Sequence, residues 1–232
     1  DCPGLNAVIR AIVYKGIKQY NYNITGIYEG WRGLLEGGPI APITLEDVHG
    51  ILDEGGTILK TSRTNPFKHR KGIELVKKTI KKYKIDVVIA IGGEDTLGVA
   101  AKLHKEGVKV IGVPKTIDND VSGTDQTFGF DTAVNIATEA IDRLRSTAEA
   151  HNRVFLVEVM GRHAGWIALH SGIAGGAHMI LVPEYPIDVD SLVSAIVKRH
   201  ARGEESSMIV VAEGARLKKD SGESGFILQE PE

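Results

Sequence analysis

The sequence predicts an α/β protein built from two lobes with mostly parallel sheets. Three observations predict this class: short runs rich in Val and Ile alternate with segments of helical period, each junction carries Gly, Pro, Asp or Asn, and the apolar runs are unbroken. Unbroken apolar runs are typical of parallel strands, because helices cover both of their faces. The 232 residues, 42% of them hydrophobic, are enough for one full core and for two smaller ones.

The expected elements follow from this alternation. We expect buried strands at residues 86–93, 108–114, 153–161, 177–183 and 206–214. Apolar residues recur at three- and four-residue steps, which indicates helices, in residues 6–19, 71–83, 96–106, 133–150 and 191–202. The turn-rich segment 113–130 joins a strand to a long helix through Pro, Asp, Asn and Gly. We therefore assign residues 1–129 to a first lobe and residues 130–232 to a second.

Composition excludes several classes of function. The 28 basic residues nearly balance the 30 acidic ones, so no broad positive field predicts a nucleic-acid partner. No apolar run approaches the roughly 18 residues that span a bilayer. The single cysteine, Cys2, excludes an internal disulfide framework and fits a reducing cytoplasm. The chain opens on DCPGLNAVIR without a methionine, a signal region or a leading strand, so we expect it to be a fragment.

The residues that follow each expected strand are non-random in type. Ligands of open α/β sheets bind outside the carboxyl ends of the strands, so these positions are the candidates for a site. Small, acidic and basic side chains follow four of the expected strands. They are Gly93, Glu94, Asp95 and Thr96 after the first strand, Lys115, Thr116, Asp118 and Asp120 after the second, Met160, Gly161 and Arg162 after the third, and Glu213 after the last. The turn at Gly93 resembles a phosphate cradle, yet it carries two carboxylates.

A purely structural role is open for several of these residues. Two glycines after a strand often form only a tight turn, and Glu94, Asp95 and Thr96 are residue types that commonly begin a helix. The segment TIDND favours chemistry more strongly. Asp118 and Asp120 point the same way from an extended segment, and they repel each other unless a metal ion or a transferable proton lies between them.

Five motifs carry a resemblance to a known family. GGEDT, PKTIDND, FGFDTA, EAIDRL and VEVMGRHAGWIAL, in this order and spacing, resemble 6-phosphofructokinases, and DCPGLNAVIR is similar to the first phosphate loop of that family. The likeness runs from Asp1 to about Arg216 and leaves LKKDSGESGFILQEPE unplaced. It implies two Rossmann-like three-layer α/β/α lobes, both incomplete here: a donor and Mg²⁺ lobe at residues 1–129 and a sugar-phosphate lobe at residues 130–232.

The resemblance implies phosphoryl transfer to the 1-hydroxyl of fructose 6-phosphate, the glycolytic step that yields fructose 1,6-bisphosphate. Asp118 resembles the general base, which takes the hydroxyl proton as the bond to phosphorus forms. Thr116, Ile117 and Asp118 then contact the reacting end of the sugar. Asp120 orients the base or a metal-bound water, and Glu94 helps to hold Mg²⁺ through oxygen ligands.

The remaining site residues also come from the resemblance. Met160, Gly161, Arg162 and Glu213 are implied to bind the sugar phosphate, and Arg63, Gly93, Asp95 and Thr96 the donor. Arg153 resembles an arginine that reaches the site of a neighbouring subunit, which implies a homodimer or homotetramer with a shared active site. A simpler alternative is that Arg153 and Arg63 are exposed charges without a role in binding. The family's histidine-arginine loop for the sugar phosphate has no counterpart in this sequence.

Two positions bear on the phosphoryl donor. Members that use ATP generally have glycines where this chain has Asp95 and Lys115, and the two replacements resemble the pyrophosphate-dependent branch. An aspartate at position 95 fills the path of a nucleotide and repels its phosphate by roughly 4 kcal/mol at about 4 Å. Lys115 would place a cation on pyrophosphate or on the departing phosphate.

The alternatives are an ATP-dependent 6-phosphofructokinase and a regulatory homologue that binds a sugar phosphate without activity. Asp118 speaks against the regulatory homologue, which would be expected to lose the base. A nucleotide-binding kinase of the diacylglycerol or NAD type also has a Gly-Gly-Asp-Gly-like turn after a strand. PKTIDND and MGRHAGW speak against that class.

Overall fold

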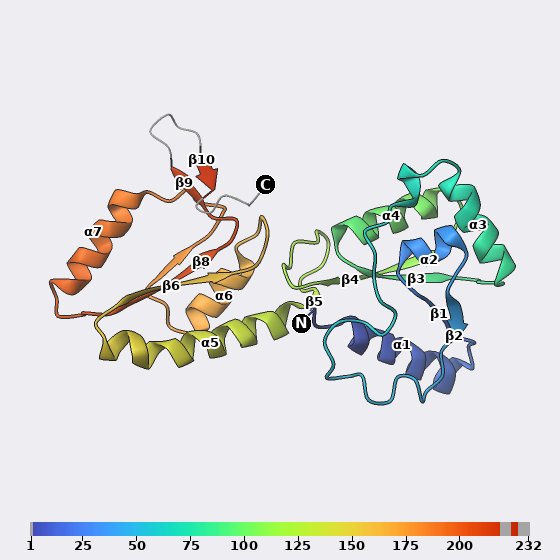
Figure 1. The fold of residues 1–232 in the computed structure, drawn as a ribbon, viewed down its shortest axis with the longest axis horizontal. Coiled ribbons are helices and arrows are strands. Elements are labelled where there is room, and N and C mark those ends of the chain that lie inside the picture. Colours follow the sequence, from blue (N-terminus) through green and yellow to red (C-terminus); the bar gives the residue numbers. More distant parts are fainter. Residues whose placement is uncertain (1, 219–223, 227–232) are drawn as a thin grey trace. The chain divides into compact units, whose positions relative to one another are not determined.

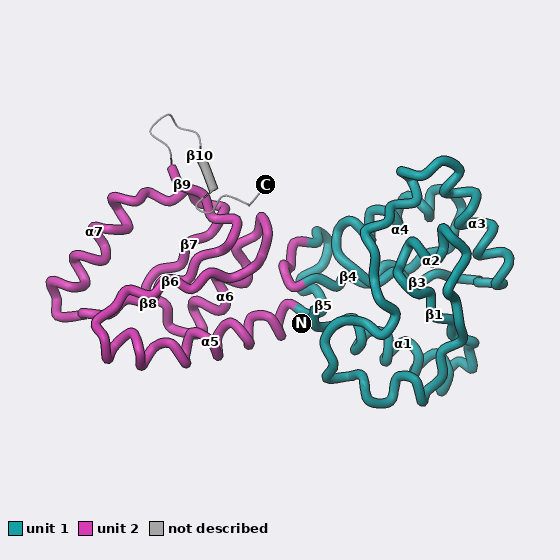
Figure 2. Tube along the Cα trace, in the orientation of Figure 1, with its two compact units in different colours: residues 1–116, 121–129 teal, residues 117–120, 130–232 magenta. Residues whose placement is uncertain are grey.

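The computed structural model describes residues 2–218 and 224–226, and its chain forms two compact units. Unit 1 comprises residues 1–116 and 121–129, and unit 2 comprises residues 117–120 and 130–232 (Figure 2). The short segment 117–120 thus belongs by its contacts to unit 2, although residues on both sides of it belong to unit 1. The sequence predicted two contiguous lobes and gave no sign of this exchange.

Unit 1 is built on a parallel sheet with the strand order β3-β4-β5 (Figure 1). Its elements, in chain order, are α1 (Leu5–Tyr20), β1 (Thr25–Ile27), α2 (Trp31–Glu36), β2 (Ile40–Pro42), η1 (Pro66–Lys68), α3 (Gly72–Lys82), β3 (Val88–Gly92), α4 (Glu94–Lys105), β4 (Val110–Thr116) and β5 (Phe128–Gly129). The strands β1 and β2 pair antiparallel to each other. Helices α1 and α4 lie on opposite faces of the parallel sheet (Figure 1).

The core of unit 1 fills both faces of this sheet. On one face Val88 and Ala90 of β3 pack with Leu103 of α4. On the other face Ile91 packs against the cluster that holds Val13 of α1. Alternate residues of β3 thus face different helices, which explains why the run VVIAIGG is apolar without interruption.

Unit 2 contains a second parallel sheet, with the strand order β6-β8-β7. Its elements are α5 (Phe130–Ala150), β6 (Val154–Val159), α6 (Trp166–Ala174), β7 (Met179–Leu181), α7 (Val189–His200), β8 (Ser207–Ala212) and the antiparallel pair β9 (Arg216–Lys218) and β10 (Ser224–Phe226). Helices α5 and α6 cover one face of the sheet, and α7 lies on the other (Figure 1). The central strand β8 is buried along its whole length.

The expected α/β fold with mostly parallel sheets is confirmed, with small shifts at element ends. Each of the five expected strands and five expected helices overlaps an observed one, and the shifts are up to three residues. For example, the expected helix at 133–150 begins earlier, at Phe130. The pattern did not predict α2, α6, η1, β1, β2, β5 or the β9–β10 pair. The unplaced stretch 217–232 lies largely outside the described residues.

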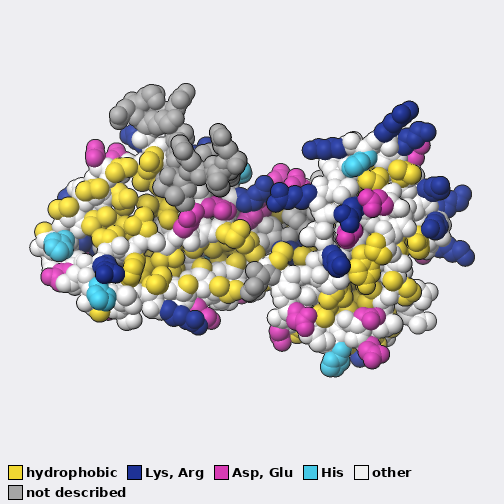
Figure 3. All heavy atoms as spheres, in the orientation of Figure 1, with side chains coloured by type: hydrophobic (Ala, Val, Ile, Leu, Met, Phe, Trp, Pro, Cys, Tyr) yellow, Lys and Arg dark blue, Asp and Glu magenta, His cyan; other side chains and the backbone are white. Residues whose placement is uncertain are grey.

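The surface shows where side chains of one kind gather. Basic side chains project around α3, and hydrophobic side chains are exposed over α7 and the sheet of unit 2 (Figure 3). On that unit Leu156 of β6 is 62% exposed, and Val197 of α7 is 60% exposed. Within the described part of the chain, no helix combines the length and the apolar character that crossing a membrane requires.

Candidate active site

The carboxyl ends of β3 and β4 bring the predicted site residues after β3 and those at the end of β4 to the same end of the sheet in unit 1. These strands pair in parallel with Gly92 opposite Pro114, so the turn after β3 and the last residues of β4 leave the sheet together. Glu94 and Asp95 occupy the first turn of α4, and both are exposed. The N-cap residue Gly93 makes no side-chain cap, so no side chain at that position competes with a ligand for the first amide groups of α4.

A glycine is required at position 92 rather than at position 93. A Cβ atom on Gly92 would lie 2.7 Å from both Cβ and Oγ1 of Thr96, which is closer than packing allows. A Cβ atom on Gly93 would meet Thr116 Cβ at 3.6 Å, an ordinary contact. Thr96 therefore packs on the end of β3, and the predicted donor role of Gly93 depends on its backbone and not on lack of space.

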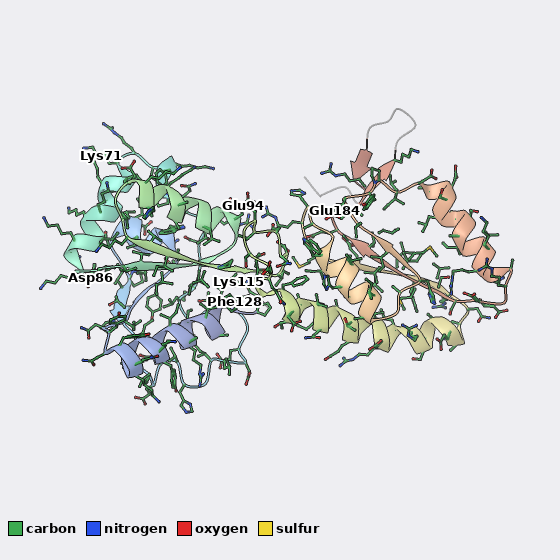
Figure 4. All side chains as sticks on the ribbon, turned by 180° about the vertical axis from the view of Figure 1, so that it is seen from behind. Lys71, Asp86, Glu94, Lys115, Phe128 and Glu184 are labelled. Carbon is green, nitrogen blue, oxygen red and sulfur yellow. The ribbon has the colours of Figure 1, made fainter. Side chains whose placement is uncertain are left out.

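Lys115 is a buried cation near the end of β4. The residue is 8% exposed, and its Nζ lies 3.2 Å from Cys2 Sγ (Figure 4). The first residues reach it because Pro3 packs on β5: a Cβ atom on Gly129 would lie 2.4 Å from the carbonyl oxygen of Pro3. Sequence reasoning missed Cys2 as a neighbour of Lys115, because nothing in a lone cysteine indicates a contact 113 residues away.

The predicted base lies in the segment that passes to unit 2. Asp118 is 7% exposed, and the next residue, Asn119, has a left-handed backbone with φ 53°. Thr116 still belongs to unit 1, where its carbonyl oxygen accepts a hydrogen bond of 2.8 Å from Thr127 Oγ1. Asp120 is half-buried. Burial of a carboxylate is costly unless hydrogen bonds or a cation compensate it. Buried carboxylates are therefore typical of functional positions.

In unit 2 the turn after β6 is held by the carboxylate of Glu213, which directly follows β8. Glu213 Oε1 accepts hydrogen bonds from Gly161 N at 3.0 Å and from Arg162 N at 2.6 Å. Arg162 adopts a left-handed backbone with φ 52°, which is uncommon for a residue with a side chain. Gly214 leaves room for this turn, because a Cβ atom there would lie 1.9 Å from the carbonyl oxygen of Arg162. The structure therefore brings Gly161, Arg162 and Glu213 into hydrogen-bond contact, with Met160 next to Gly161 in the chain, and their roles in binding remain predictions.

Arg153 does not lie beside Arg162. Arg153 precedes β6, whereas Arg162 follows it. The two arginines therefore lie at opposite ends of the strand, roughly 20 Å apart for a strand of this length. Arg63 is exposed and lies between Ser62 and Thr64, whose hydroxyl groups bond to each other at 3.2 Å. Neither arginine makes a side-chain hydrogen bond or ion pair within the ranges that the structure describes. Their predicted roles remain predictions.

Of the acidic residues, Glu94 is the predicted ligand of Mg²⁺. No group of three or more His, Cys, Asp or Glu side chains suited to a metal ion occurs among residues 2–218 and 224–226. Mg²⁺ commonly takes only one or two protein carboxylates and completes its shell with water and substrate phosphates. Glu94, exposed at the start of α4, can supply one such ligand.

The comparisons with known proteins identify the family. A family model described as Phosphofructokinase matches residues 1–230. The chain belongs to the phosphofructokinase family. This confirms the resemblance that the five motifs predicted, and it agrees with the parallel α/β units.

Relatives of this phosphofructokinase chain include proteins named for either donor. Over 216 residues it is 60% identical to pyrophosphate–fructose 6-phosphate 1-phosphotransferase of Streptomyces coelicolor, covering 93% of this chain and 63% of the relative. It is 51% identical to ATP-dependent 6-phosphofructokinase 3 of the same organism, covering 94% of this chain and 64% of the relative. The chain thus spans somewhat less than two thirds of these relatives.

Among solved structures, phosphofructokinase from Pichia pastoris in the T-state matches with a TM-score of 0.87 at 35% identity, over 94% of this chain and 25% of that chain. The pyrophosphate-dependent phosphofructokinase from Marinobacter aquaeolei matches with a TM-score of 0.73 at 25% identity, over 92% of this chain and 57% of that chain. The phosphofructokinase fold is thereby confirmed.

Proposed function

We propose that the full-length protein transfers a phosphoryl group from pyrophosphate to the 1-hydroxyl of fructose 6-phosphate. The observation that carries the proposal is the buried Lys115, three residues before the buried Asp118. The one side-chain hydrogen bond of this lysine within the described residues is to a thiol, which is a weak partner for a charge. A buried ammonium group needs an anion, and a compact polyanion such as pyrophosphate provides one.

The residues divide the reaction between them. As the oxygen of the 1-hydroxyl bonds to the terminal phosphorus, its proton passes to the Asp118 carboxylate, and the bridging P–O bond breaks to release inorganic phosphate. Lys115 neutralises charge on the pyrophosphate and on the phosphate that leaves. Mg²⁺, held in part by Glu94, supplies further neutralisation of the phosphate oxygens when it is bound. Arg162 binds the phosphate group of the sugar phosphate, with Met160 and Gly161 lining the same site, and Glu213 contacts the sugar.

Asp95 determines the donor in this proposal. Its carboxylate lies in the first turn of α4, where the helix dipole stabilises a negative charge. A nucleotide that extends past this turn would bring its own phosphate near that carboxylate, at a cost of roughly 4 kcal/mol, or about three powers of ten in affinity. Pyrophosphate ends before this point and avoids the repulsion.

Steady-state rates with each donor test the proposal on the full-length protein. Wild type should use pyrophosphate with Mg²⁺ and show little rate with ATP. Asp95→Gly should improve ATP binding by up to about three powers of ten, and less if the turn relaxes. Adding Lys115→Gly should lower turnover with pyrophosphate more than turnover with ATP. Gly98→Ala is the control, because it lies in the same helix and faces open space.

An ATP-dependent 6-phosphofructokinase is the second candidate, since relatives with that name are 51–54% identical to this chain. A wild type that prefers ATP would support this candidate. An Asp95→Gly variant whose ratio of donor rates does not move would likewise contradict the role of Asp95. Neither result would affect the assignment to the family.

A further inference from the structure

Glu184 contacts the turn after β6, and it follows a strand that the sequence predicted, although Glu184 itself was not among the predicted site residues. It follows β7, at the same carboxyl edge of the unit 2 sheet as Glu213, which follows β8 (Figure 4). Its Oε1 atom accepts a hydrogen bond of 2.8 Å from Gly165 N. Gly165 is the N-cap residue of α6, and as a glycine it has no side chain that could cap the helix.

The segment 182–184 packs directly on Gly165. A Cβ atom on that glycine would lie 2.5 Å from Val182 Cβ and 2.7 Å from Glu184 Oε2. The backbone of residue 165 is therefore packed closely against Val182 and Glu184, and its amide is also bonded by the Glu184 carboxylate. A hydrogen bond from a backbone amide to an ionised carboxylate is stronger than one between neutral groups, so Glu184 contributes a directed constraint.

Two carboxylates thus hold the two ends of one short turn. Glu213 bonds the amides of Gly161 and Arg162, and Glu184 bonds the amide of Gly165. Between them Ala164 N bonds the carbonyl oxygen of Gly161 at 2.9 Å. The left-handed backbone of Arg162 is unfavourable by itself, and such conformations persist where the surroundings fix them from several sides.

We propose that Glu184 is a positioning residue for the sugar-phosphate site. It fixes the far end of the turn that carries Arg162 and so sets where the guanidinium group lies, without touching the substrate itself. The inference rests on the proposed function, because that function assigns Arg162 to the sugar phosphate. Arg162 binds the phosphate of the ground state as well as of the transition state, so its displacement should raise KM more than it lowers kcat.

Three variants of the full-length protein test this inference. Glu184→Ala removes the acceptor, Glu184→Gln keeps an acceptor oxygen without the charge, and Asp142→Ala removes an acid from the exposed surface of α5 as a matched control. Glu184→Ala should raise the KM for fructose 6-phosphate about tenfold and leave the KM for pyrophosphate unchanged. Glu184→Gln should recover most of the loss, and Asp142→Ala should match wild type.

Amide hydrogen exchange gives a readout that does not depend on activity. The amide of Gly165 should exchange faster in Glu184→Ala, by about tenfold or more, and near the wild-type rate in Glu184→Gln. An unchanged KM in Glu184→Ala would overturn the positioning role. The positioning role would also be overturned if both Glu184 variants had the same lower kcat, the same higher KM and the same lower melting temperature. That result would show that Glu184 has a structural role alone.

The failure of the proposed function is a separate outcome. If wild type does not phosphorylate fructose 6-phosphate with either donor, that function is wrong. Calorimetric titration of fructose 6-phosphate alone then decides the role of Glu184. Weaker binding to Glu184→Ala than to wild type supports the inference, whereas equal binding, or no binding by wild type, overturns it.

Discussion

At the scale of single residues, the candidate site combines a buried lysine, Lys115, with exposed carboxylates. The lysine is 92% buried beside a thiol, while two carboxylates of the same unit, Glu94 and Asp95, lie exposed at the start of α4. Burial of an ammonium group is costly unless hydrogen bonds or an anion compensate it, and among the described residues the one side-chain hydrogen bond of Lys115 is to that thiol. Exposed carboxylates, by contrast, carry little cost until a second anion approaches them. The proposed preference for pyrophosphate over a nucleotide rests on this contrast between a buried cation and exposed carboxylates.

Asp118→Asn tests the general base. The amide keeps the shape of the carboxylate and much of its hydrogen-bonding capacity, but it cannot accept the proton of the hydroxyl group. Turnover should fall by at least two to four powers of ten, while the affinity for fructose 6-phosphate stays within about threefold. Rates and equilibrium binding on the same preparation give both values. An unchanged turnover number would remove Asp118 from this role.

At the residue scale, the sequence predicted best the polar side chains that directly follow a strand. The rule that ligands bind at carboxyl ends of strands selected Arg162 and Glu213, which the structure joins by a hydrogen bond of 2.6 Å. The same rule applied to the strand before Pro183 would have selected Glu184. The contact between Cys2 and Lys115 follows from the packing of Pro3 on β5, and no local pattern encodes such a contact.

At the scale of elements, length decided which ones could be predicted. The helix α5, with 21 residues, gives several turns of apolar periodicity, whereas α2, with six, gives fewer than two. Strands such as β5, with two residues, have no period at all. The short elements are held by tertiary contacts: Thr127 bonds the end of β4, and Pro3 packs against Gly129 of β5.

Gly214→Ala tests how closely the end of β8 approaches the turn after β6. The added Cβ would lie 1.9 Å from the carbonyl oxygen of Arg162, so the turn must move. The free energy of unfolding should fall by about 1–3 kcal/mol, and the KM for fructose 6-phosphate should rise. Gly98→Ala, which meets no atom within 4 Å, should instead be neutral or stabilising by up to about 1 kcal/mol. Denaturant titrations that rank the two variants equally would contradict the close approach.

We expect the hydrogen bond between His178 and Met208, which links the start of β7 to β8, to depend on pH. Its Nδ1 atom accepts a hydrogen bond of 2.8 Å from Met208 N, which requires a neutral ring nitrogen. Partial burial and the charges of Arg199 and Arg145 lower the pKa of His178, against weaker opposing effects of Glu204 and Glu149. The unfolded chain takes up a proton near pH 6.5, so the stabilisation is present above that pH and is lost as the pH falls through the lower pKa of the folded state.

His178→Asn should therefore flatten the pH dependence of stability below pH 6.5, because an amide oxygen can replace the acceptor without titrating. The ring is partly exposed, so the difference from wild type should stay below about 1 kcal/mol. Denaturant titrations at pH 7.5 and pH 5.5 measure it, with His49→Asn in unit 1 as the control. Identical pH dependence in His178→Asn and wild type would contradict the assignment.

At the scale of the whole molecule, a short segment that belongs to unit 2 interrupts the sequence of unit 1. Residues 117–120 carry Asp118 into unit 2, whereas Lys115 stays in unit 1. The sequence predicted a turn-rich boundary in this region because Pro, Asp, Asn and Gly cluster there. It could not predict this interruption, because the partition depends on contacts made far along the chain and not on local propensity.

The role predicted for Arg153 requires an assembly of more than one chain. Arg153 lies at the opposite end of β6 from Arg162, so it cannot act beside Arg162 of its own chain without a large rearrangement. The predicted role in a neighbouring subunit's site fits this placement. In a symmetric dimer each site would then combine Asp118 of one chain with Arg153 of the other.

Mixed dimers test this arrangement. An Arg153→Ala chain and an Asp118→Asn chain should each have low activity, and equal mixing with random exchange should make half of the dimers mixed. Each mixed dimer contains one site with both residues intact and one site with neither, so about one quarter of the sites should be active. Turnover should approach that fraction once native mass spectrometry shows the mixed species. If verified mixed dimers show no recovery, Arg153 acts within its own chain or has no role in the site, and the two defects would then simply average.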